Sequence, residues 1–242
     1  MNLLVPAYFY PSNNSTYWQD LAAAAKAVST TIILNPGSGP GTSVDPNYVS
    51  VIDMVRKSGG KVIGYVPTGY GKRPLDEVTD EIDRYINYYH VDGFFIDQMT
   101  TDTLDGNVAY YKSIYDYIKG LNTLYSVTGN PGTMPNEVYL SHPLVDNLVV
   151  FEGSESSYAD FLPSEWQSKY PKDRFAHLVY NADAEQMERV FNLSSDNIVG
   201  NLYVTGEETR NPYDALPKYW DLEVQTASVT HELGFNKNRS AV

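Results

Sequence analysis

The sequence has no cysteine, few histidines and few positive charges. The absence of cysteine excludes disulfides, thiol catalysis and cysteine-bound metals. The four histidines show neither HxH nor HExxH spacing, so we expect no metal site, and nothing in the sequence calls for a cofactor. Only 17 lysines and arginines oppose 30 aspartates and glutamates, which gives a net charge of −13. This charge disfavours nucleic acids and anionic membrane surfaces as partners.

Long hydrophobic runs are missing as well. No apolar stretch approaches the roughly 18 residues that cross a bilayer, so we expect no membrane insertion. The segment Met1–Tyr8 lacks the basic region and the cleavage site of a signal peptide. We therefore expect a soluble monomer, either cytoplasmic or a secreted domain whose signal has been removed.

Aromatic residues, by contrast, are plentiful. Tyrosine occurs 21 times, and hydrophobic residues make up 42% of the 242 positions, which is ample for a core. Tyrosine combines a flat apolar face with a polar tip, a combination that suits stacking on sugar rings, although we expect most copies to cover strands and helices. The length is close to the roughly 250 residues of an eight-fold β/α barrel.

Short apolar runs alternate with amphipathic stretches along the whole chain, which predicts strands that alternate with helices. The expected strands are Leu3–Tyr10, Thr30–Asn35, Lys61–Pro67, Gly93–Met99, Tyr125–Asn130, Asn147–Glu152, Ala176–Asn181 and Asn197–Thr205. The expected helices are Tyr17–Val28, Pro46–Lys57, Leu75–Tyr89, Gly106–Lys119, Pro163–Tyr170, Ala184–Phe191 and Tyr213–Leu233, with a short helical turn within Pro135–His142. This series predicts an α/β fold, a single (β/α)8 TIM-type barrel over residues 1–242. An open Rossmann-type sheet is the alternative, but no GxGxxG follows any strand.

Polar side chains gather where the expected strands end. In a parallel barrel these ends open together into the mouth where catalysis takes place. The apolar run before Asp97 and Gln98 and the run before Glu152 are the clearest cases, because a buried strand has no structural need to end on an acid. The other polar residues at strand ends are Tyr8, Tyr10, Asn35, Tyr65, Asn130, Asn181, Tyr203 and Thr205. A single polar strand end is often a turn former, but so many together predict a functional mouth.

Two carboxyl groups facing each other suit hydrolysis of a glycosidic bond. One protonates the leaving oxygen, and the other attacks carbon or activates water, at separations of roughly 5–10 Å. We expect Asp97 as nucleophile or base and Glu152 as acid, acting on a polysaccharide or oligosaccharide substrate. The expected substrate-binding residues are Tyr8, Asn35, Tyr65, Gln98, Asn130, His177 and Tyr203. For Asn35 and Asn130 the competing role is to complete their own turns, and for His177 it is that of a core histidine.

Several motifs together resemble the spherulin-4-like proteins. They are Pro6–Pro11, Ile33–Gly41, Val62–Val66, Asp92–Asp97, Asn130–Thr133 and Val150–Glu152, which come in the family's order. The resemblance implies a (β/α)8 barrel with glycoside hydrolase activity. Characterised fungal members cleave α-1,4-linked N-acetylgalactosamine within galactosaminogalactan, a polymer that is partly cationic after deacetylation. An acidic protein would suit such a polymer.

One position departs from the family pattern. The family usually carries Asp-Glu at the end of the fourth strand, where this chain has Asp97 and Gln98. Gln98 could keep the hydrogen bonds of a glutamate that only orients substrate, could mark a different sugar or linkage, or could leave a catalytically disabled barrel that binds glycan. An unrelated barrel enzyme such as an aldolase is disfavoured, because no expected strand ends on a lysine for a Schiff base.

Overall fold

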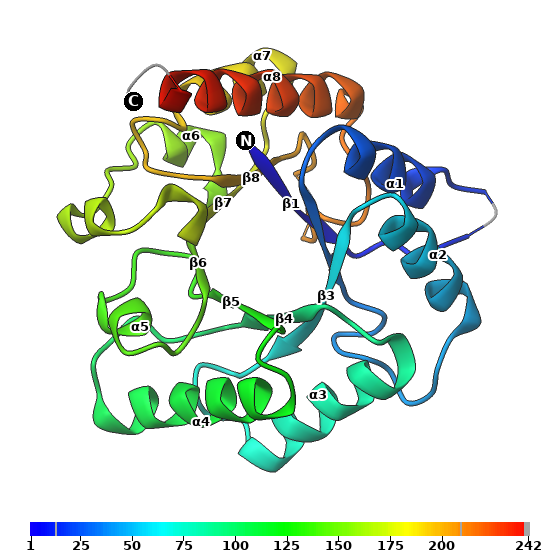
Figure 1. Ribbon diagram of the computed structural model, residues 1–242, viewed down its shortest axis with the longest axis vertical. Coiled ribbons are helices and arrows are strands. Elements are labelled where there is room, and N and C mark those ends of the chain that lie inside the picture. Colours follow the sequence, from blue (N-terminus) through cyan, green and yellow to red (C-terminus); the bar gives the residue numbers. More distant parts are fainter. Residues whose placement is uncertain (13, 209, 240–242) are drawn as a thin grey trace.

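The computed structural model describes residues 1–12, 14–208 and 210–239, and shows a ring of strands enclosed by helices (Figure 1). The strands are β1 (Asn2–Ala7), β2 (Thr30–Leu34), β3 (Lys61–Pro67), β4 (Gly93–Asp97), β5 (Ser126–Asn130), β6 (Asn147–Ser154), β7 (Phe175–Tyr180) and β8 (Asn201–Val204). The α-helices are α1 (Tyr17–Ala27), α2 (Pro46–Lys57), α3 (Leu75–Tyr89), α4 (Asp105–Leu121), α5 (Val138–Ser141), α6 (Glu155–Tyr158), α7 (Ala184–Leu193) and α8 (Trp220–Arg239). Two 3-10 turns, η1 (Glu165–Lys169) and η2 (Lys172–Arg174), precede β7.

The eight strands close into one barrel in chain order, and every neighbouring pair is parallel. The predicted (β/α)8 fold is therefore confirmed, and an open sheet is excluded. Because each helix returns the chain, the C-terminal ends of all the strands meet at one end of the barrel, here called the mouth. None of the helices in the described ranges is long and apolar enough to cross a membrane.

Close packing locks the helix layer onto the barrel at Gly64. A Cβ on this residue of β3 would lie 2.6 Å from the ring of Tyr85, a contact that real side chains do not make. Tyr85 of α3 therefore packs directly on the strand backbone, and its hydroxyl donates to the carbonyl oxygen of Leu34 at 3.0 Å. The position of α3 in turn fixes one end of the loop between β3 and α3, which lies at the mouth.

Two expected helices differ from the structure. In place of a helix over Pro163–Tyr170 the chain forms only η1, in which Ser164 and Gln167 close a tight capping box between two prolines. The last helix begins at Trp220 instead of Tyr213, because Pro217 restricts the residue before it to extended backbone and the helix starts beyond it. Residue Tyr213 is thereby left in a loop at the mouth.

A bulge in β6 decides which side chain of that strand faces the barrel interior. Side chains alternate along a strand, so counting from Asn147 a regular strand would turn Phe151 inward and Glu152 outward. The pairing with β7 shifts register between Val149 and Phe151, which makes Val150 an extra residue. The alternation is reversed beyond it, and Glu152 faces inward.

The seam between β1 and β8 is closed by side chains and a loop rather than by a full ladder. Only two residue pairs join these strands, at their N-terminal ends. Nearer the mouth, the N–H of Tyr8 donates to the carbonyl oxygen of Tyr213 at 3.1 Å. The N–H of Val204 donates to the buried carboxyl of Glu223 in the first turn of α8, at 2.8 Å. The segment between β8 and α8 therefore completes the barrel wall.

We predict that Glu223→Gln stabilises the protein increasingly as pH rises. Burial raises the pKa of Glu223 well above its usual 4.5, so the folded protein keeps a proton that the unfolded chain releases. In the wild type, the contribution of Glu223 to the free energy of unfolding is therefore full below pH 4.5. This contribution falls by about 1.4 kcal/mol per pH unit as the pH rises toward the folded pKa. Urea unfolding at several pH values measures the difference, and a constant difference between pH 5 and 8 would contradict this account.

Candidate active site

Two carboxyl groups at the mouth share one amide. Asp97 ends β4, Asn130 ends β5, and Glu152 lies in β6 just beyond the bulge. The side-chain nitrogen of Asn130 donates to Oδ1 of Asp97 at 2.8 Å and to Oε2 of Glu152 at 2.7 Å. The Asn130 oxygen accepts from the N–H of Gly132 at 2.9 Å, which fixes the orientation of the amide. The sequence-predicted pair and one predicted binding residue therefore meet in a single cluster.

The shared amide limits how far apart the carboxyl groups lie. Their bridged oxygens cannot be separated by more than the sum of the two hydrogen-bond lengths, about 5.5 Å. Carboxyl groups about 5–5.5 Å apart are typical of double-displacement glycoside hydrolysis, and single displacement uses about 6.5–9.5 Å. The bridged oxygens therefore lie closer together than the carboxyl groups of a single-displacement pair.

Three tyrosines complete a ring around the carboxyl pair. The hydroxyl of Tyr65 donates to Asp97 at 2.6 Å, and the hydroxyl of Tyr213 donates to Glu152 at 2.7 Å. The ring of Tyr8 stands edge-on to both tyrosines, with each pair of centroids 5.6 Å apart. Hydrogen bonds and aromatic contacts thus join the three tyrosines, the carboxyl pair and the Asn130 amide into one continuous network.

Burial is the main electrostatic influence on both acids. It raises the pKa of Asp97, against the hydrogen bonds from Tyr65, the Gln98 backbone and Asn130, which lower it. It also raises the pKa of Glu152, with the negative charge of Asp97 adding to the rise and the donors Asn130 and Tyr213 opposing it. Asp97 has three donors that favour its charged form, and Glu152 has two. Burial therefore raises both pKa values, and the charge of Asp97 raises that of Glu152 further.

The comparisons with known proteins place the chain in a family. The model of the spherulation-specific family 4 matches residues 2–227. The chain belongs to this family. Spherulin-4 of Physarum polycephalum is 32% identical over 245 residues, which cover 96% of this chain and 71% of that protein. The resemblance to the spherulin-4-like proteins that the sequence motifs indicated is thereby confirmed.

Solved structures share the fold of this family member. The crystal structure of Aspergillus clavatus Sph3 in complex with GalNAc matches with a TM-score of 0.82 at 24% identity, over 94% of this chain and 97% of that one. A chitinase of Bacteroides thetaiotaomicron matches with a TM-score of 0.60 at 10% identity, over 94% and 96% of the two chains. At these identities the likeness concerns the barrel fold.

Gln98, the departure from the family pattern, points toward the loop after β3. Its side-chain oxygen accepts from the N–H of Gly69 at 3.2 Å, and its backbone is left-handed, with φ of 54°. Its carbonyl oxygen accepts from the N–H of Tyr70 and from the hydroxyl of Thr68, both at 2.8 Å. The side chain of Gln98 therefore joins the end of β4 to the neighbouring loop, while its backbone N–H donates to Asp97.

Three residues expected to bind substrate are placed differently from the cluster. Asn35 uses its side-chain oxygen on its own turn, accepting from Gly39 at 3.0 Å. His177 lies on the outer side of the barrel wall, where its Nδ1 is 2.9 Å from the Tyr158 hydroxyl and burial lowers its pKa to about 3. Tyr203 is fully buried, and its ring lies 6.3 Å from those of both Tyr213 and Trp220, so it packs behind Tyr213 and not against the two acids.

The strand alternation explains the position of His177. In the barrel register it pairs with Phe151, whereas the next residue, Leu178, pairs with the inward-facing Glu152. His177 therefore faces the helix layer, where the ring of Phe161 lies 4.7 Å away. The structure places it in the core, not in the mouth.

Tyr213 is the residue of the cluster that the sequence reasoning missed. It was assigned to the first turn of a helix, although Pro217 four positions later is a signal against helix there. The loop after the eighth strand of a barrel lies at the mouth, so the sequence alone could have identified an aromatic residue there as a candidate site residue.

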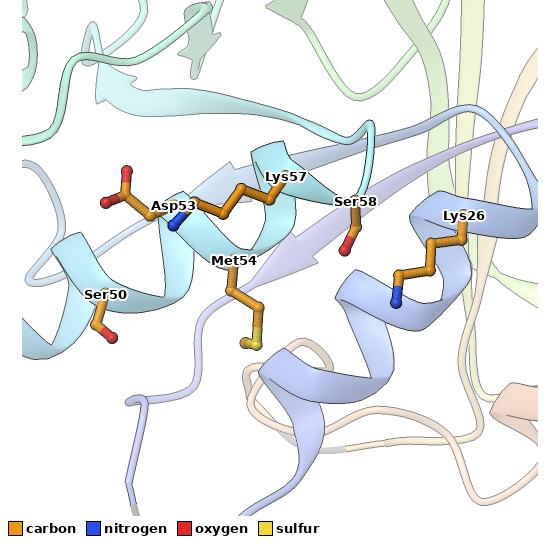
Figure 2. Close-up of a pocket in the computed structure, with 6 residues that line it drawn as sticks. All are labelled: Lys26, Ser50, Asp53, Met54, Lys57 and Ser58. Carbon is orange, nitrogen blue, oxygen red and sulfur yellow. The ribbon is translucent and has the colours of Figure 1, made fainter.

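A hollow on the outer surface lies apart from this cluster. It has a volume of about 480 Å³ between α1 and α2 and is lined by Lys26, Ser50, Asp53, Met54, Lys57 and Ser58 (Figure 2). The lining comes from helix faces toward the end of the barrel opposite the mouth, and it holds a single carboxylate. In the described ranges no group of three or more histidine, aspartate or glutamate side chains is arranged to hold a metal ion.

We predict that Tyr213→Phe raises the pKa of Glu152 further, because it removes a hydrogen bond that favours the charged carboxylate. Carboxyl-carbon NMR titration with labelled glutamate measures this shift without any assay of activity. Tyr203→Phe is the matched control, since Tyr203 packs beside Tyr213 without donating to Glu152. An equal shift in both variants, or none in Tyr213→Phe, would contradict the assignment.

Proposed function

We propose that this protein is a glycoside hydrolase that cleaves within an N-acetylhexosamine-rich polysaccharide, with Asp97 and Glu152 as its carboxyl pair. The observation that carries the proposal is the shared Asn130 amide, which holds the two acids within the range that this chemistry uses. Membership of the spherulin-4 family supports it. So does the GalNAc in the crystal structure of Sph3, a protein of the same fold.

The electrostatics support a different role for each acid. Asp97, with three hydrogen-bond donors, is the nucleophile, and Glu152, whose pKa is raised by burial and by the charge of Asp97, is the acid. Tyr65 fixes the attacking carboxylate, and Tyr213 fixes the acid. Asn130 sets the distance between them.

The separation of the pair supports a double displacement. An Asp97 oxygen forms a bond to the anomeric carbon as the glycosidic bond breaks, and Glu152 gives its proton to the leaving oxygen. Glu152, now a carboxylate, takes a proton from water as that water attacks the anomeric carbon and releases Asp97. The configuration at the anomeric carbon is retained.

A glycan-binding barrel without turnover is the second candidate. One observation favours it, namely Gln98 in the place of the glutamate that the family usually carries. An amide cannot act as acid, base or nucleophile, so Gln98→Glu separates the two candidates. If that glutamate is the missing catalytic group, the substitution creates activity where the wild type has none.

We predict that Asp97→Asn and Glu152→Gln each lower cleavage of a partly deacetylated α-1,4-N-acetylgalactosamine polymer at least a thousandfold, since each removes one half of the carboxyl pair. Release of reducing ends measures cleavage. The control is Glu208→Gln, an exposed carboxyl in the loop after β8, which should cleave like the wild type. Full activity in either of the first two variants would refute the assignment.

A further inference from the structure

Only two of the 21 tyrosines are exposed, and both lie on loops at the mouth. Tyr70, between β3 and α3, is 57% exposed, and Tyr10, between β1 and α1, is 51% exposed. All 21 belong to the described part of the chain, and the other nineteen are buried or half-buried. A protein that otherwise covers its tyrosines therefore presents two aromatic faces on the side where the carboxyl pair lies.

The turn that carries Tyr70 is held in an unfavourable backbone conformation. Gly69, Tyr70 and Gly71 are all left-handed, with φ of 58°, 57° and 75°. Glycine adopts this conformation freely, but a bulky residue rarely does. The left-handed backbone of Tyr70 costs energy, and its side chain stays mostly exposed instead of recovering that energy by packing in the core.

Neighbouring elements hold this turn firmly. Gln98 accepts from the N–H groups of both Gly69 and Tyr70, the second at 2.8 Å. Farther along the loop, Arg73 donates to the carbonyl oxygen of Pro67 at 2.8 Å and pairs with Glu81 at 2.9 Å. The exposed ring is therefore displayed from a fixed loop whose anchor, Gln98, directly follows the proposed nucleophile in the sequence.

Tyr10 is fixed in a different way. Its hydroxyl donates to the Asp45 carboxylate at 2.9 Å and accepts from the Asn47 amide at 2.6 Å. Its ring stands edge-on to that of Tyr48, with centroids 5.5 Å apart. The polar tip is fully engaged, so the ring face is what Tyr10 offers to a ligand.

We propose that Tyr70 and Tyr10 are stacking platforms for sugar rings of the glycan chain beyond the cleaved bond. The inference rests on the proposed function and deepens it by naming residues that would hold the sugar units away from the reacting bond. A pyranose presents an apolar face of C–H groups, which an exposed aromatic face covers without charge or hydrogen bonds. Because the Tyr10 ring and the backbone turn that carries Tyr70 are held beforehand, less conformational entropy is lost on binding.

Gln98 gains a role in this account that does not need an acid. It is a positioning residue for the Tyr70 turn, because it accepts from two N–H groups of that turn. A glutamate could make the same bonds, but an alanine could not accept from Gly69 through its side chain. Gln98 thus connects the stacking platform to the strand that ends on Asp97.

We predict that Tyr70→Asn, placed in Asp97→Asn protein so that nothing is cleaved, weakens binding of an α-1,4-N-acetylgalactosamine hexasaccharide about tenfold, the size expected from losing the cover of one ring face. A disaccharide, which offers fewer sugar rings to the platform, should lose less. Asparagine tolerates a left-handed backbone, so the turn itself is preserved. Isothermal titration calorimetry measures both affinities.

Tyr70→Phe keeps the ring and should bind the hexasaccharide as the parent does. Leu124→Ala is the control for a lost exposed apolar side chain, since Leu124 is 86% exposed at the opposite end of the barrel. Equal hexasaccharide affinity in Tyr70→Asn and its parent would overturn the inference, as would a parent that binds neither oligosaccharide. If Tyr70→Asn lowers the hexasaccharide affinity but protein with native Asp97 does not cleave the polymer, the stacking role is supported and the proposed hydrolase activity is refuted. If protein with native Asp97 cleaves the polymer but Tyr70→Asn leaves the affinity unchanged, the hydrolase activity is supported and the stacking role is refuted.

Discussion

The amide of Asn130 is the contact on which the rest of the mouth depends. Two acids so close together repel each other and lose hydration, and a single neutral group with two N–H bonds relieves both costs without supplying a positive charge. The Asn130 oxygen is held by Gly132, whose carbonyl oxygen in turn accepts from the N–H of Glu152 at 2.9 Å. One turn after β5 therefore fixes both the bridge and the backbone of one acid.

Two backbone irregularities bring the remaining groups to this bridge. The bulge at Val150 turns Glu152 into the barrel, where regular alternation would have placed Phe151. The incomplete pairing of β1 with β8 leaves a gap near the mouth, and the loop that fills it carries Tyr213 to Glu152. Both irregularities weaken the regular ladder, and both contribute directly to the carboxyl cluster. The departures from an ideal barrel are thus concentrated where the proposed chemistry takes place.

Features that depend on local sequence patterns could be predicted from the sequence, and features that depend on contacts between distant residues could not. Apolar periodicity is local, so the eight strands and the barrel were predictable, as were Asp97 and Glu152 as acids at strand ends. The inward turn of Glu152 was not, because the bulge that causes it depends on pairing with β7. The place of Tyr213 was missed because loop closure beside β1 decides where it points, and the choice between mouth and core for His177 stayed open because strand register decides it.

The neutrality of Gln98 fits the electrostatic balance of the cluster. The hydrogen-bond donors to the two acids are an amide, two hydroxyls and a backbone N–H, none of them charged. No cation in the described part of the chain is among the groups that shift these pKa values, so an added negative charge nearby would raise them. A glutamate at position 98 would place a third carboxyl beside Asp97, whereas the amide keeps the bonds to Gly69 and Tyr70 without that charge. In the proposed mechanism Asp97 is the ionised member of the pair and Glu152 holds the proton, a division that a third carboxyl would oppose.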